Sequence, residues 1–200
     1  MKPNLVGRVA SVILGLMAAS LTSLAQVPAS DNHLTVLLYD YVNLPPSVRS
    51  ELTADTVRIL GRAAITVEFV ECPAGGVKSD NEVCLAPLGP TDLVLRIFPP
   101  TSAKTGEELG NAILGPGGGA YMTVYPRPAR ADGLSAGMML GHAVAHEIGH
   151  LLLGLNAHAA SGIMRPVIRR SDEKMVKAWL LFDADQANRM RTALIARASR

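Results

Sequence analysis

The sequence His146-Glu147-Ile148-Gly149-His150 constrains this chain more than any other stretch. In an α-helix, side chains four residues apart lie on the same face, about 6 Å apart along the axis. His146 and His150 can therefore direct two imidazoles at one metal ion. Glu147 can reach the same place without acting as a ligand, in the position of a general base. The motif predicts a helix that carries part of a metal site.

The residues after the motif offer a third ligand. Catalytic zinc usually takes three protein ligands and leaves a fourth position for water. Gly154 can adopt a left-handed conformation and end the helix, so that the chain turns back and brings His158 to the metal. The segment 161–166, Ser-Gly-Ile-Met-Arg-Pro, then places Met164 in a tight turn.

Together these residues resemble the metzincin family of zinc peptidases, whose motif is H-E-x-x-H-x-x-G-x-x-H followed by a Met-turn. Here Gly154 lies one residue later than in that pattern and His158 two residues later, and the last position of the pattern falls on Asn156. We favour His158 because an amide is a poor zinc ligand and because a slightly longer helix before the same glycine would accommodate the shift. The resemblance implies that Met164 forms an apolar floor under the ligands and does not bond the metal.

The resemblance also implies an activity. Zn²⁺ held by His146, His150 and His158 would activate a water molecule for the hydrolysis of peptide bonds in a peptide or protein substrate, with Glu147 as general base. The alternative is a non-hydrolytic zinc-binding or interaction domain on the same fold. A zinc hydrolase that acts on cell-wall peptides is a closer variant.

The N-terminus has the pattern of a targeting segment. Lys2 and Arg8 precede an apolar stretch from Val9 to Leu24, which ends in the small-x-small sequence Ser23-Leu24-Ala25. We therefore expect a signal peptide at residues 1–25 and a single domain at 26–200 that is secreted or periplasmic. An uncleaved anchor is the alternative, although the apolar run is short for a membrane span.

Charge gives no indication of a nucleic-acid partner. The predicted signal peptide contains two of the 19 basic residues and none of the 17 acidic ones, so the mature chain would carry balanced charges. Because no nucleic-acid-binding motif occurs either, we expect neither a nucleic-acid partner nor stable membrane association after cleavage. The sequence gives no indication of the oligomeric state.

The two cysteines, Cys72 and Cys84, are close in the sequence. In an exported protein, such a pair predicts a disulfide that closes a short loop. Two free thiols are the alternative. A metal-binding pair is disfavoured because zinc-binding cysteines are typically about two to four residues apart.

The remaining patterns predict the fold. We expect strands at about 34–39, 65–70, 92–98 and 120–125, a loop over 101–119, and helices at about 48–62, 136–153 and 184–198, with a further helix start at 171–173. This order predicts an α+β (α/β-like) domain whose twisted, mostly parallel sheet of about four strands packs on helices, including the zinc helix and a C-terminal helix. The resemblance implies that the strand at 120–125 is the edge strand of the cleft and can pair with an extended substrate.

Particular positions within the helices carry further expectations. The first helix should turn its apolar side chains inward (Leu52, Val57, Ile59 and Leu60). The glycines of the zinc helix should allow close packing against the sheet (Gly137, Gly141 and Gly149). His142 shares the face of His146, but we interpret it as a packed or solvent-facing histidine in preference to a support for the ligands.

Overall fold

The computed structural model describes residues 32–100, 109–115, 118–127, 135–154, 157–166 and 180–200. The predicted signal peptide at 1–25 and the predicted helix start at 171–173 lie outside these ranges. Within them, the helices are all too short or too polar to cross a membrane.

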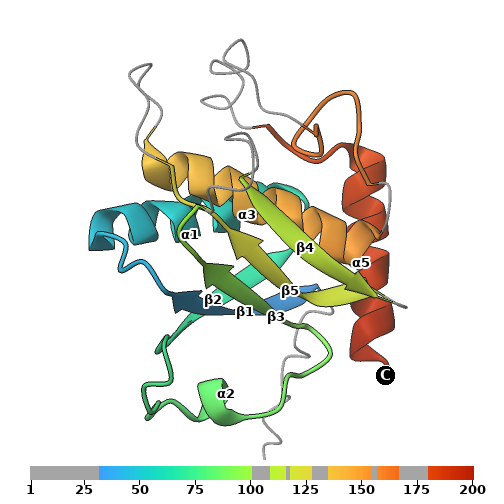
Figure 1. Cartoon of the computed structure of the whole chain (residues 1–200). Coiled ribbons are helices and arrows are strands. Elements are labelled where there is room, and N and C mark those ends of the chain that lie inside the picture. Colours follow the sequence, from blue (N-terminus) through green and yellow to red (C-terminus); the bar gives the residue numbers. More distant parts are fainter. Residues whose placement is uncertain (1–31, 101–108, 116–117, 128–134, 155–156, 167–179) are drawn as a thin grey trace, which may run out of the picture.

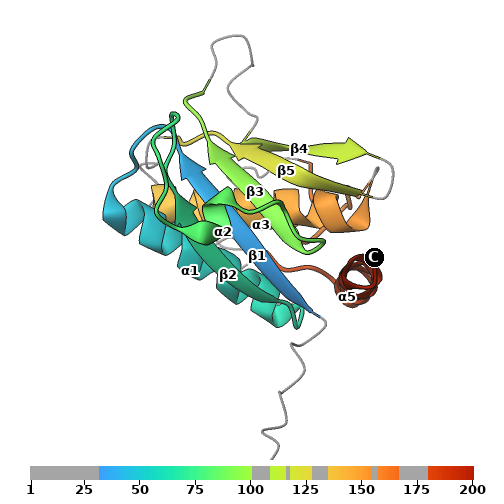
Figure 2. The same ribbon diagram turned by 90° about the horizontal axis from the view of Figure 1, so that it is seen from below.

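The described residues form one mixed sheet with helices on both of its faces (Figure 1). The sheet has the strand order β2-β1-β3-β5-β4, in which only β4 is antiparallel to its neighbour. α1 and α3 lie side by side on one face, and the short α2 lies over the other face, toward β1 and β2 (Figure 2). The predicted α+β architecture is confirmed. In chain order the elements are β1 (His33–Asp40), α1 (Pro46–Arg62), β2 (Thr66–Cys72), α2 (Glu82–Leu85), β3 (Asp92–Ile97), β4 (Gly110–Gly115), β5 (Gly118–Val124), α3 (Ala136–Leu153) and α5 (Ala184–Ala198).

Strand β4 corrects two predictions. Residues 110–115 form a strand where a loop was expected. The loop was expected because this short apolar run has a glycine at each end. β4 pairs antiparallel with β5, with Gly115 opposite Gly118. β4 is therefore the edge strand of the sheet, and β5, which was expected at the edge, lies between β3 and β4.

The main core lies between the sheet and the helices. Leu95, Ile97, Met122 and Val124 point from β3 and β5 toward α3 and are fully buried. On α1, Leu52, Ile59 and Leu60 are buried as predicted, but Val57 is 41% exposed because it lies on the opposite side of the helix.

Helix α3 packs closely against α1. Ser135 Oγ accepts a hydrogen bond of 3.0 Å from Met138 N and begins the helix where the sequence predicted. A Cβ atom added at Gly141 would lie 2.6 Å from Asp55 Cβ and 2.9 Å from the Leu52 carbonyl oxygen, and Gly137 is equally close to α1. Gly137 and Gly141 therefore allow contact with a neighbouring helix, and the expectation that they face the sheet is wrong.

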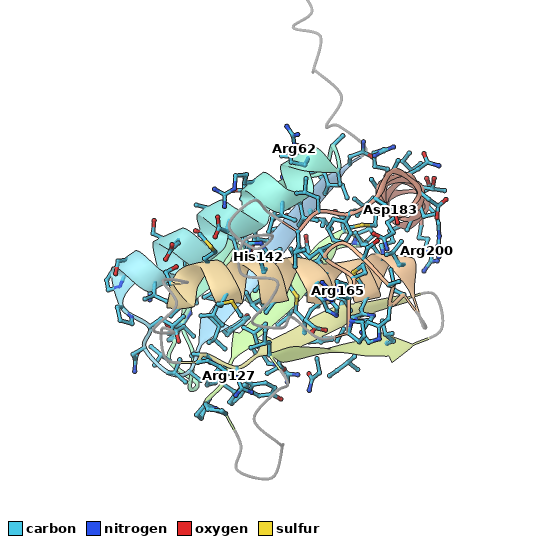
Figure 3. All side chains as sticks on the ribbon, turned by 90° about the horizontal axis from the view of Figure 1, so that it is seen from above. Arg62, Arg127, His142, Arg165, Asp183 and Arg200 are labelled. Atoms are coloured by element: carbon cyan, nitrogen blue, oxygen red, sulfur yellow. A yellow bond between two sulfur atoms is a disulfide. The ribbon has the colours of Figure 1, made fainter. Side chains whose placement is uncertain are left out.

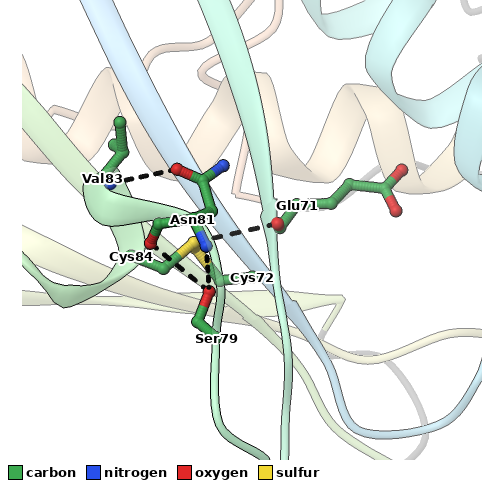
Figure 4. Close-up of a disulfide and its surroundings, with 6 residues drawn as sticks. All are labelled: Glu71, Cys72, Ser79, Asn81, Val83 and Cys84. Atoms are coloured by element: carbon green, nitrogen blue, oxygen red, sulfur yellow. Dashed lines mark hydrogen bonds between the residues drawn. A yellow bond between two sulfur atoms is a disulfide. The ribbon is translucent and has the colours of Figure 1, made fainter.

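The predicted disulfide between Cys72 and Cys84 is present (Figure 4). It ties the end of β2 to α2. Asn81 caps α2 by accepting a hydrogen bond of 3.0 Å from Val83 N, and Ser79 Oγ accepts one of 3.1 Å from Asn81 N. The cysteine loop is thus a small hydrogen-bonded structure at the β2 edge of the sheet.

Helix α5 has the predicted boundaries and begins with a capping box between Asp183 and Gln186. Met190 and Leu194 are fully buried against the core. Near its end, the buried Arg197 donates a hydrogen bond of 2.5 Å to the carbonyl oxygen of Leu151. α5 therefore holds the C-terminal turn of α3.

Candidate metal centre

The three histidines that the sequence singled out lie together. His146 and His150 come from successive turns of α3, and His158 comes from the segment 157–166 that follows the helix. His150 Nε2 lies 3.0 Å from His146 Nε2 and 3.1 Å from His158 Nε2. The candidate ligand atoms of all three side chains lie within 4.8 Å of one another.

The end of α3 explains how His158 reaches the other two histidines. The helix ends at Gly154, which has φ of 83° and ψ of −162°, a conformation that a residue with a Cβ atom rarely adopts. His158 lies beside His150 at the end of the helix, and in the turn that follows Ala159 N donates a hydrogen bond of 2.8 Å to the carbonyl oxygen of Met164. The helix thus ends at Gly154, as the sequence predicted.

Hydrogen bonding and burial prepare the imidazoles to act as ligands. The carbonyl oxygen of Ile163 accepts a hydrogen bond of 2.7 Å from His146 Nδ1, so the proton of the neutral ring belongs on Nδ1 and the lone pair on Nε2. Burial lowers the pKa of His146. Burial, together with the nearby His146 and His158, lowers the pKa of His150 to about 4. Both rings are neutral at neutral pH, which is the form that binds metals.

The spacing of the nitrogens fits a zinc ion. With Zn–N bonds of about 2.0–2.1 Å, two ligands of a tetrahedral site lie about 3.3 Å apart. The observed separations of 3.0 and 3.1 Å are close to that value. Three lone pairs that converge at such distances repel one another unless a cation or a proton lies between them. The donor set therefore suits a borderline-soft divalent ion with one coordination position left open.

Glu147 lies beneath the edge strand. Its side chain is 5% exposed, and a Cβ atom added at Gly110 of β4 would lie 3.0 Å from both Glu147 Cγ and Glu147 Oε1. The glycine therefore leaves the space that the carboxylate occupies. Sequence reasoning identified Glu147 but missed Gly110, because the two residues are far apart in the chain and no local pattern connects them.

Met164 lies against the metal-site helix. It is fully buried, and an added Cβ at Gly149 would collide with Met164 Sδ and lie 2.9 Å from Phe182. Gly149 is the glycine within the H-E-x-x-H sequence, so its lack of a side chain lets the turn approach the helix. Met164 thus packs against α3 at Gly149, the residue next to His150 in the chain.

The turn is itself held by the chain that leads into α5. Ile163 N donates a hydrogen bond of 3.0 Å to the carbonyl oxygen of Leu181. Gly162 has φ of 74°, and a Cβ atom there would lie 2.7 Å from the same carbonyl oxygen. Ile163, whose carbonyl oxygen orients His146, is therefore itself held by the segment that precedes α5.

His142 lies outside the histidine cluster. It is fully buried between α3 and α1, and its Nδ1 lies 2.9 Å from the Met138 carbonyl oxygen (Figure 3). Burial lowers its pKa, and the nearby Arg58 of α1 lowers it further. The interpretation of His142 as a packed histidine agrees with this placement.

The chain was compared with known proteins by sequence and by structure. Comparison of the sequence with protein-family models and with curated proteins gives no match. The fold, however, is similar to that of the crystal structure of archaemetzincin from Methanopyrus kandleri, with a TM-score of 0.59 and 15% sequence identity. The similarity covers 84% of this chain and 99% of that chain. The resemblance to metzincins is thereby confirmed at the level of the fold: the protein has an archaemetzincin-like α+β fold.

Proposed function

We propose that this protein is a zinc-dependent metallopeptidase, with His146, His150 and His158 as the ligands and Glu147 as the general base. The observation that carries the proposal is the convergence of three imidazole Nε2 atoms at a helix that also carries the buried carboxylate of Glu147. A purely structural zinc site gains nothing from such a carboxylate and is normally closed by a fourth protein ligand. The archaemetzincin-like fold supports the same proposal.

In this mechanism each side chain has a separate task. Zinc, when bound, supplies the Lewis acid that acidifies a water molecule and polarises the scissile carbonyl group. Glu147 accepts the proton of the attacking water on a carboxylate oxygen and passes it to the leaving amine. The carbonyl of Ile163 keeps the proton of His146 on Nδ1, and Met164 keeps the underside of the histidines apolar.

The substrate would approach along β4. Among the described strands β4 has a partner on one side only, so its outer edge can pair with an extended peptide. Because Gly110 of β4 lies directly over Glu147, a peptide on that edge passes close to the general base.

We further propose that the enzyme is secreted or periplasmic, since the predicted signal peptide at 1–25 and the disulfide both suit an exported protein.

The test measures zinc content and peptide cleavage in four proteins: the wild type, His158→Ala, Glu147→Ala and His33→Ala. The wild type should hold about one zinc per chain and cleave a peptide library. His158→Ala should lose most of its zinc. Glu147→Ala should keep its zinc, while its kcat falls by about 100-fold or more, because general-base catalysis is removed. His33→Ala is the matched control, since His33 lies on β1 outside the cluster.

Three other outcomes would each contradict one part of the proposal. If His158→Ala held zinc as tightly as the wild type, the third ligand would lie elsewhere. If the wild type held zinc and cleaved no peptide, a non-hydrolytic zinc-binding domain would replace the proposed peptidase. If Glu147→Ala kept most of the activity, the proposed mechanism would be wrong.

A further inference from the structure

A groove lies on the sheet face that points away from the metal centre. Leu95, Ile97, Met122 and Val124 point toward α3, so the residues between them in β3 and β5 point to the opposite face. Figure 2 shows this face: α2 lies in front of the part near β1 and β2, and none of the described helices lies in front of β4 and β5. The groove in this uncovered part has a volume of about 620 Å³. Its lining residues include Arg96, Phe98, Asn111, Ile113, Thr123 and Tyr125.

The strand register places polar side chains in one row across the groove. Arg96 of β3 is paired with Tyr39 of β1 on one side and with Thr123 of β5 on the other, and Thr123 is paired with Asn111 of β4. Side chains paired in this way share a face and lie next to one another. Asn111 Nδ2 also donates a hydrogen bond of 3.2 Å to Tyr125 Oη, which fixes the amide at the end of the row.

Apolar rows flank the polar row on both sides. Toward the carboxyl ends of the strands, Tyr41 and Phe98 stack with ring centroids 4.3 Å apart. Toward the other ends, the register aligns Val94 with Tyr121 and Tyr121 with Ile113. Tyr41, Tyr121 and Ile113 are 40%, 44% and 54% exposed, so this face presents large apolar surfaces to solvent. Exposed apolar side chains gathered around a polar group are typical of a binding site.

Among the described residues that line the groove, Arg96 is the only charged one. Within the part of the chain that the structure describes, its buried Nε has no hydrogen-bond partner and no carboxylate forms an ion pair with its guanidinium. A buried donor without a partner is costly, and a guanidinium binds a carboxylate through two parallel hydrogen bonds. One cation among apolar walls suits a ligand with one negative charge better than a phosphate dianion.

We propose that this groove is a second binding site, distinct from the metal centre, for an organic carboxylate attached to an apolar or aromatic body. The carboxylate pairs with Arg96, Asn111 and Thr123 supply further polar contacts, and the apolar body lies against Phe98 and Ile113. A free organic acid and an acidic side chain within an apolar peptide carry the same chemistry. The site does not depend on the proposed peptidase activity, because its residues lie on the face of the sheet opposite the one that faces α3 and Glu147.

The first measurement uses ¹⁹F NMR to compare how tightly the zinc-loaded protein binds 4-fluorophenylacetate and its neutral analogue, 4-fluorophenylacetamide. The acid should bind and the amide should bind about tenfold more weakly, because only the acid pairs with the guanidinium. Arg96→Gln should also lower the affinity for the acid by about tenfold. Arg96→Lys should restore part of the affinity, since lysine keeps the positive charge but cannot form the bidentate hydrogen bonds. Arg62→Gln, at an exposed arginine of α1, should bind the acid as the wild type does.

A second arm separates the two sources of the carboxylate. Acetylated and amidated Leu-Glu-Leu and Leu-Gln-Leu are compared by how well each displaces 4-fluorophenylacetate in the same ¹⁹F NMR assay. Tighter binding of Leu-Glu-Leu than of 4-fluorophenylacetate identifies an acidic peptide side chain as the ligand, and the reverse order identifies a free acid. The proposal is overturned if neither carboxylate binds, or if the amide binds as tightly as the acid on the wild-type protein.

Removal of zinc is the last control. Carboxylates also bind zinc, so binding that disappears with the metal would place the acid at the histidines and overturn the proposal. Binding that persists without zinc and depends on Arg96 supports it. This result is independent of whether the protein cleaves peptides, so failure of one proposal leaves the other standing.

Discussion

At the scale of single residues, glycines set the space around the proposed active site. Gly110 of β4 lies against the carboxylate of Glu147, and Gly149 of α3 lies against Met164. In both places an added methyl group would have to displace a functional side chain. These glycines therefore have packing roles that can be tested separately.

Gly110→Ala should impair catalysis without removing the metal. The new Cβ would lie 3.0 Å from Glu147 Oε1 and 2.9 Å from the Thr123 carbonyl oxygen, so the carboxylate must move. Displacement of a catalytic group by about 1 Å can cost about 100-fold in rate, and we expect a loss of this size in kcat/KM. Zinc content should remain that of the wild type. Gly61→Ala is the control, because no atom lies within 4 Å of the added Cβ and activity should be unchanged.

Gly149→Ala should weaken both stability and zinc binding. The added Cβ collides with Met164 Sδ, and overpacking of a buried contact typically costs about 1–3 kcal/mol. The displaced turn also contains Ile163, which orients His146. Urea unfolding and competition with a zinc chelator measure the two effects. Unchanged values in both assays would show that the turn does not press on α3.

At the scale of secondary-structure elements, the disulfide and the metal centre lie at opposite edges of the sheet. Cys72 ends β2, and the residues above Glu147 belong to β4, at the other end of the strand order. The cysteine loop should therefore contribute to stability and leave catalysis unaffected.

Replacing both Cys72 and Cys84 by serine tests this separation. The bridge joins residues separated by 12 positions, and closing a loop of this length stabilises a fold by about 3 kcal/mol. The variant should lose about that much free energy of unfolding and keep the kcat/KM of the wild type. A large loss of activity in folded variant protein would refute the separation. Reduction of the wild type by a thiol reagent provides the matched comparison.

The elements differ in how far the sequence predicts them. Ser135, the apolar run and Gly154 define α3 at both ends, because each acts through hydrogen bonds or backbone conformation within its own neighbourhood. β4 was missed because its glycines suggested a loop, and only pairing with β5 makes it a strand. The candidate ligands were identified by their spacing along the chain, whereas the role of Gly110 depends on a contact across the fold. The groove around Arg96 depends on strand register, which local patterns do not specify.

At the scale of the whole molecule, buried titratable groups make stability depend on pH. His142 is fully buried near Arg58 of α1, which forms an ion pair with Asp55, and burial lowers its pKa. The unfolded chain takes up a proton at this histidine near about pH 6.5, and the folded protein does not. The free energy of unfolding should therefore be highest above this pH and decrease as the pH falls below it.

His142→Leu should reduce that pH dependence. Metal-free wild type and variant are unfolded in urea between about pH 7.5 and pH 5, a range that spans the pKa of an unfolded histidine. Both proteins contain His146 and His150, whose lowered pKa values act in the same direction, so the difference between them isolates His142. The wild type should lose more stability than the variant over this range. If the free energy of unfolding fell equally with pH in both proteins, His142 would take up its proton as readily in the folded protein as in the unfolded chain.

The hydrogen bonds that orient His146 also determine when the site can form during synthesis. His146 is held by Ile163, and Ile163 is held by the carbonyl of Leu181. The ribosome releases α3 well before these partners, so a nascent chain has the helix long before it has the complete set of histidines in place. The histidine cluster is therefore completed late in folding. A newly made chain should pass through a stage in which it holds the proposed zinc weakly and lacks the proposed hydrolytic activity.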